Sequence, residues 1–121
     1  MTDQRFIIEM GIGNDQYGQD YTKAAARAIE DAIRHSAIPM FAALDMNHED
    51  MRVQVTVGVQ NPDAVDCTAL AAKLPRGRAE VIAVHGGLDV TNPDDGNVIV
   101  MATAAVEAFL PSQAGKWSIA D

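Results

Sequence analysis

The chain has little cysteine, few aromatic residues and little positive charge, and each shortage excludes a class of protein. The single cysteine, Cys67, rules out an internal disulfide and favours a reducing cytoplasm; its helical context marks it as a small core residue. Aromatic residues make up only 5% of the sequence, so the core must be aliphatic. Nine Lys and Arg against 17 Asp and Glu give a formal net charge of −8, which argues against nucleic-acid binding.

Long hydrophobic runs are also missing. The apolar stretches are too short to span a bilayer, and the first residues lack the apolar core of a secretion signal. The spacing of His, Cys and acidic residues resembles no metal site, and the glycine spacing does not match a dinucleotide-binding motif. At 121 residues we expect a single domain, with a core at about 5–110 and a tail at 111–121.

The hydrophobic pattern predicts four strands and two helices. Valines at alternate positions of 51–59 mark the clearest strand, with one buried face. The alanines of 97–110 are compatible with a helix, but β-branched residues at its start favour a strand. Residues 86–96 are rich in turn formers and predict a loop. We expect strands at about 5–10, 51–59, 78–85 and 97–110, and helices at about 20–36 and 62–74.

This order, β-α-β-α-β-β, predicts an α+β fold in which a four-stranded mixed sheet carries both helices on one face. The strand at 78–85 is apolar on both faces, since Val81 and Ala83 alternate with Ile82 and Val84. Two helices cover only one side of a sheet, so the other side must meet water or another subunit. Because exposed apolar patches usually mark interfaces, we expect a homo-oligomer with sites shared between subunits.

The segment between the first strand and the first helix is rich in glycine and polar residues. Its backbone N–H groups lie next to a helix N-terminus, with Asp20 as the N-cap, and such an arrangement binds anions. Asp15 and Tyr17 can orient or protonate a ligand there. The alternative is a tight turn without a ligand, because Asn and Asp readily bond their own backbone. The candidate ligand-binding residues of this segment are Gly11, Gly13, Asn14 and Gly18.

Two cations, Lys23 and Arg27, follow in the first turns of the helix. Cations at this end oppose the helix dipole and repel each other, each effect costing about 0.3–1 kcal/mol. Either they hold an anion together with the loop, or acidic neighbours such as Asp20 and Asp31 offset them on a solvated surface.

A third candidate is His85, which ends a strand just before Gly86 and Gly87. An imidazole at a strand end beside flexible backbone suits acid–base chemistry, and a hydrogen-bonded structural histidine is the alternative. The candidate catalytic residues are therefore Asp15, Tyr17, Lys23 and His85, with Gly86 and Gly87 as ligand-binding candidates.

At residues 11–33 the sequence resembles a small, broadly distributed family of conserved hypothetical proteins. That family is marked by Gly-x-Gly-x-Asp-x-His-Gly and a following Thr-Lys-Ala-Ala helix. Here residues 11–18 read Gly-Ile-Gly-Asn-Asp-Gln-Tyr-Gly and residues 22–25 read Thr-Lys-Ala-Ala. The likeness extends to the Val-rich strand and to Gly86-Gly87. Tyr17 stands where the family has histidine, which implies a lost or changed activity if that histidine handles protons; the family brings no established function.

Two remoter likenesses concern the fold and the reaction. The element order is similar to that of chorismate mutase-like and imine deaminase-like folds, trimers whose pockets lie between subunits. The stretch 20–23 and the pair Gly86-Gly87 also resemble single repeats of the ring-opening cyclic amide hydrolases, the cyanuric acid hydrolase and barbiturase group. Those enzymes pair a serine before the two glycines with a lysine. His85 replaces that serine here and no lysine falls in the expected loop, so their mechanism does not transfer.

Together these patterns predict a cytoplasmic homo-oligomer, with a trimer favoured, that binds a small anionic or cyclic metabolite in a pocket between subunits. Lys23 and Arg27 would neutralise charge there, and His85 or Tyr17 would handle protons in a hydrolase or deaminase type of reaction. A non-catalytic ligand-binding or structural assembly module is the alternative. We expect no metal, no cofactor, no nucleic acid and no membrane partner.

Overall fold

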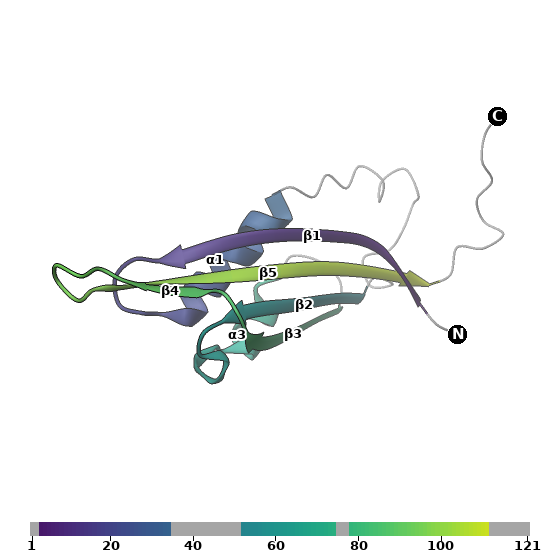
Figure 1. Ribbon diagram of the computed structural model, residues 1–121. Coiled ribbons are helices and arrows are strands. Elements are labelled where there is room, and N and C mark those ends of the chain that lie inside the picture. The colour runs from purple at the N-terminus through teal and green to yellow at the C-terminus, as the bar shows by residue number, and fades with distance from the viewer. Residues whose placement is uncertain (1–2, 35–51, 75–77, 112–121) are drawn as a thin grey trace, which may run out of the picture.

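The computed structural model describes residues 3–34, 52–74 and 78–111. In this part of the chain one mixed sheet carries two α-helices, as the sequence predicted, and Figure 1 shows both helices behind the sheet. No helix in these ranges has the length and hydrophobicity needed to span a membrane. The elements in chain order are β1 (Asp3–Asp15), α1 (Tyr21–Arg34), β2 (Arg52–Val59), the 3-10 turn η2 (Pro62–Ala64), α3 (Cys67–Ala72), β3 (Arg78–His85), β4 (Leu88–Thr91) and β5 (Val98–Pro111).

The strands lie in the order β1-β5-β2-β3. β5 is antiparallel to both of its neighbours, whereas β2 and β3 are parallel. β4 pairs with the first part of β5, beyond the end of β2, so β4 and β5 form a hairpin that extends from the sheet (Figure 1). The prediction of four strands was therefore one short. Leu88 and Val90 alternate with polar residues, and this short strand pattern was hidden among turn formers.

The core lies between the helices and one face of the sheet. Val55, Val57, Val59 and Val100 are fully buried there, in keeping with the shortage of aromatic residues. The helix α1 meets these valines through buried alanines at 24, 25, 28 and 32, and their small side chains let its backbone come close to the strands.

The strand β1 is longer than predicted and includes the two glycines that were assigned to a loop. Gly11 and Gly13 lie inside β1, opposite the helix α1. A Cβ on Gly11 would lie 2.4 Å from the Ala32 nitrogen, and one on Gly13 would lie 2.3 Å from the Ala28 nitrogen. The loop prediction for these two residues was wrong: the glycines leave room for the helix backbone.

The predicted helix over 62–74 is divided in two. Pro62 begins the short turn η2, Val65 is extended, and α3 starts at Cys67, which is half-buried. Asp66 caps α3 by accepting a hydrogen bond from the Ala69 nitrogen at 3.0 Å. The predicted end of the first helix at residue 36 and the tail after residue 111 lie outside the described residues.

Candidate functional site

The first candidate site is the turn between β1 and α1, which is organised around the buried carboxylate of Asp15. Asp15 is only 3% exposed to solvent. Its Oδ2 accepts a hydrogen bond from the Asp20 nitrogen at 3.0 Å, and its Oδ1 lies 3.7 Å from both Lys23 Nζ and Arg27 Nη1. A buried carboxyl group requires such partners, and the two cations and the Asp20 backbone amide provide them.

Further contacts hold this turn from neighbouring elements. Arg27 Nη1 donates to the Asn14 carbonyl at 2.6 Å, and the side-chain amide of Asn97 donates to the Gln16 carbonyl at 2.6 Å. Gly18 has φ +100°, a conformation that L residues with side chains rarely adopt. The turn is therefore fixed by its own sequence and by the turn of the β4–β5 hairpin.

The helix after this turn begins as predicted. Asp20 Oδ1 accepts a hydrogen bond from the Lys23 nitrogen at 3.0 Å, which confirms Asp20 as the N-cap. Lys23 and Arg27 remain about half exposed, with side-chain accessibilities of 52% and 46%, but both face Asp15. Tyr17 is 77% exposed and lies at the surface. The nearest anion to the two cations is thus part of the protein itself.

The sequence did not predict the contact between the start of α1 and β4. The Tyr21 hydroxyl donates to Asp89 Oδ2, while Asp89 Oδ1 is buried without a partner in the described part of the chain. The hydrogen bond to this carboxylate, together with burial and the negative charge of Asp89, raises the pKa of Tyr21. Only the pairing of β4 with β5 brings these two residues together.

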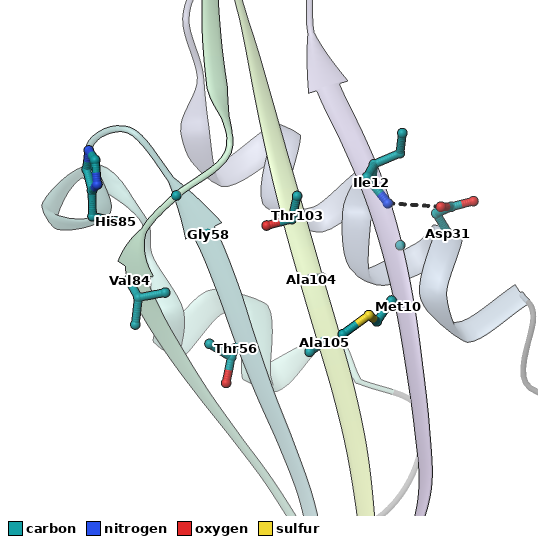
Figure 2. A pocket seen from close by; sticks show the side chains of 12 residues that line it. Met10, Ile12, Asp31, Thr56, Gly58, Val84, His85, Thr103, Ala104 and Ala105 are labelled. Carbon is teal, nitrogen blue, oxygen red and sulfur yellow. Dashed lines mark hydrogen bonds between the residues drawn. The ribbon is translucent and has the colours of Figure 1, made fainter.

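The second candidate site is a depression of about 500 Å³ on the sheet face opposite the helices. Figure 2 shows Thr56 and Thr103 on its floor, Met10 and Ile12 along β1, and His85 at the end of β3 with its ring turned away from both threonines. Across the described ranges, no group of three or more His, Cys, Asp or Glu is placed to hold a metal ion. The lining residues are Met10, Gly11, Ile12, Asp31, Thr56, Gly58, Val84, His85, Gly86, Thr103, Ala104 and Ala105.

Three glycines let the chain cross from β3 to β4 beside this depression. A Cβ on Gly58 would lie 2.7 Å from Thr103 Oγ1 and 3.4 Å from the Gly86 Cα. Gly87 has φ +62°, and a Cβ there would meet the Met101 carbonyl oxygen at 2.2 Å. Gly86 and Gly87 therefore have a structural task that the sequence alone did not reveal.

The structure does not gather the predicted catalytic residues into one place. β3, which carries His85, is separated from β1, which carries Asp15, by the two strands β2 and β5. Asp15 and Lys23 belong to the turn, whereas His85 and Gly86 belong to the depression. The role of each residue toward a ligand stays a prediction.

An α+β sheet with helices on one face, and with no described element covering the other, defines the structural class of this protein. Residues 5–108 match a family described as conserved hypothetical protein (Lin0512_fam), and the chain belongs to that family. It is also similar to a crystal structure described as an FtsZ-like protein of unknown function from Nostoc punctiforme PCC 73102. The two are 35% identical with a TM-score of 0.81, over 93% of this chain and 99% of the other. None of the curated proteins compared matches the chain.

Proposed function

We propose that this protein self-associates through the bare face of its sheet and binds a small molecule at the junction between copies. The observation that carries the proposal is a set of large apolar side chains left exposed on this face. Asp89 meets α1, so its neighbours Leu88 and Val90 point to the opposite, bare side. The exposed apolar side chains of this face are Ile8, Met10, Ile12, Ile82, Val84, Leu88 and Val90.

The size of the bare face suits a second copy of the chain. β5 has 14 residues, which at about 3.3 Å per residue gives a length of about 45 Å. β1 has 13 residues, but β2 and β3 have only 8 each and β4 has 4, so with about 4.8 Å between strands the five strands give a face of roughly 740 Å². A standard protein interface buries about 800 Å² on each partner. The sheet alone therefore provides enough surface for a stable contact.

The charge of the bare face also suits a second copy. The strands place Arg5, Arg52, Glu80 and Glu107 on this face and Asp31 of α1 lines its depression, so these described side chains nearly cancel in charge although the chain as a whole carries −8. Arg5 pairs with Glu107 at 3.3 Å, and the Arg52 guanidinium lies 4.0 Å above the ring of Phe109. Near-cancellation of charge on this face lowers the electrostatic barrier to meeting an identical partner.

A partner over the sheet would turn the depression into an enclosed pocket. Its volume of about 500 Å³ falls in the range of roughly 300–1,000 Å³ that is usual for small-molecule sites. The polar side-chain groups on its floor, two threonine hydroxyls among apolar side chains, fit a small cyclic or anionic metabolite. Binding at such a junction links occupancy to assembly, because the pocket is complete only when two copies meet.

Of the two candidate functions, binding of a small molecule without catalysis is the one that the geometry supports best. Asp15 and Lys23 are engaged with each other, and two strands separate them from His85. A hydrolase or deaminase type of reaction, using His85 with groups from the partner copy, is the second candidate. Conversion of the bound molecule by the wild-type protein, lost in His85→Ala while assembly persists, would establish that candidate.

Sedimentation analysis of a charge substitution tests the assembly. The wild type should sediment at two or three times its 12.9 kDa mass, with three favoured by the likeness to trimeric folds. Met10→Asp places a charge on a side chain that is 69% exposed on the bare face, and should yield monomers that remain folded. Ala72→Asp, on the exposed end of α3, is the matched control and should leave the mass unchanged. A monomeric wild type at high concentration would refute the proposal.

A further inference from the structure

The depression contains almost no charge that a ligand could use. His85 and Asp31 are its ionisable residues, and Asp31 Oδ2 already accepts a hydrogen bond from the Ile12 nitrogen at 2.9 Å (Figure 2). In the described part of the chain no Lys or Arg lines the depression. Lys23 and Arg27 lie against Asp15 instead. An anion enclosed there would lack the paired cations that a buried charge requires.

Small residues form the floor of the depression, and larger side chains stand at its two sides. Gly86 passes over the buried Gly58, with its Cβ position only 3.2 Å from the Gly58 Cα, and with Ala105 it leaves the floor without large side chains. Met10 of β1 and Val84 of β3 rise on opposite sides, with β5 and β2 between them. Three strand spacings place those walls about 14 Å apart. This shape accepts a flat ring lying parallel to the sheet.

Two hydroxyl groups stand on this floor. Thr56 is opposite Ala105, and Thr103 is opposite Gly58, so the threonines lie on adjacent strands and are close in register. Neither hydroxyl forms a hydrogen bond within the described residues. Each can donate one hydrogen bond and accept others, so together they match a group with an N–H and a C=O side by side.

We propose that the depression binds an uncharged planar ring bearing a carboxamide-type edge. The ring lies on Gly86 and Ala105, and its polar edge bonds the hydroxyls of Thr56 and Thr103. Met10, with its flexible and polarisable thioether, packs beside the ring. This inference rests on the proposed junction pocket and narrows its ligand from an anionic or cyclic molecule to a neutral ring.

Three matched probes test charge and shape separately on the full-length chain. Nicotinamide is neutral and planar, nicotinate replaces its amide by a carboxylate, and cyclohexanecarboxamide keeps the amide on a puckered ring. Amide resonances of Gly58, Gly86 and Thr103 should shift on titration with nicotinamide. Nicotinate and cyclohexanecarboxamide should each bind about tenfold more weakly. Tighter binding of nicotinate, or no shift at these three residues with nicotinamide, would overturn the inference.

A substitution locates the polar contact. Thr103→Val removes the hydroxyl but keeps the shape of the side chain, and should weaken nicotinamide binding about fivefold. Thr68→Val, on the exposed side of α3, should have no effect. Sedimentation of the same samples separates the two proposals. Assembly without nicotinamide binding rejects the ring inference alone, whereas binding by a monomer rejects the proposed assembly alone.

Discussion

At the scale of single residues, Asp15 and Gly13 have structural roles that differ from the ligand-binding roles that the sequence predicted. In the sequence both belong to a polar, glycine-rich segment typical of ligand loops. In the structure Asp15 is buried and draws Lys23 and Arg27 toward itself, so charges that looked available are partly neutralised. Gly13 is a strand residue in contact with a helix backbone. The cost of two cations near a helix N-terminus is thus offset by an internal carboxylate.

Replacing Gly13 by alanine tests this packing. The new methyl group would meet the Ala28 nitrogen at 2.3 Å and the Arg27 carbonyl carbon at 2.6 Å. Both are backbone atoms of α1, which cannot rotate out of the way as a side chain could. We expect the free energy of unfolding to fall by about 3 kcal/mol, near the upper end for overpacked sites, measured by urea denaturation. Gly96→Ala is the control, since its position has φ +74° but no atom within 4 Å. Gly13 does not have a positive φ, so an equal loss in both variants would show that the contact with α1 costs no more than the backbone strain at Gly96.

At the scale of elements, the β4–β5 hairpin is joined to the rest of the fold by side chains as well as by the sheet. Tyr21 at the start of α1 donates a hydrogen bond to Asp89 on β4. Asn97, just before β5, donates one to the turn after β1. The hairpin carries Leu88 and Val90 onto the bare face. These contacts therefore set the position of part of the proposed interface.

Tyr21→Phe should loosen this hairpin. The substitution leaves the buried Asp89 carboxylate without its donor, and loss of a hydrogen bond to a charged group costs about 1.5–3 kcal/mol. Hydrogen exchange should accelerate at the β4 amides more than at those of β2. Tyr17→Phe, which changes an exposed phenol, should leave exchange unchanged. Uniform acceleration throughout the sheet would instead indicate global destabilisation.

The same contact gives a pH dependence with a defined sign. The pKa of Tyr21 is raised in the folded protein, so the protonated phenol is the favoured form there. Its contribution to stability is complete below the unfolded pKa of about 10 and is lost as the pH rises through the higher folded value. Chemical denaturation between about pH 9 and 12 should show this alkaline loss in the wild type and a smaller one in Tyr21→Phe. Identical profiles would exclude the contact as its source.

At the scale of the whole molecule, helices cover one face of the sheet, whereas the other face exposes large apolar side chains and is covered by no element of the described ranges. The sequence predicted this asymmetry from strands that are apolar on both sides, and the exposure of Ile82 and Val84 confirms it. The negative charge of the chain opposes contact between copies, whereas the described ionic side chains of the bare face nearly cancel. Association should therefore depend on apolar contact, with repulsion as the opposing force.

What the sequence determined by itself is mainly local. Alternating valines defined β2 within a residue, the predicted limits of β3 were correct, and Asp20 was correctly identified as a helix cap. These features depend on neighbours in the chain, so hydrophobic period and capping chemistry are sufficient to recognise them.

The tertiary structure alone decided which distant groups meet. It placed Gly13 against α1, paired Tyr21 with Asp89, and separated His85 from Asp15 by two strands. Each of these depends on the strand order and on the close approach of a helix backbone, for which no short sequence pattern exists. The physical reason is that periodicity records which face of an element is buried, but not which partner buries it.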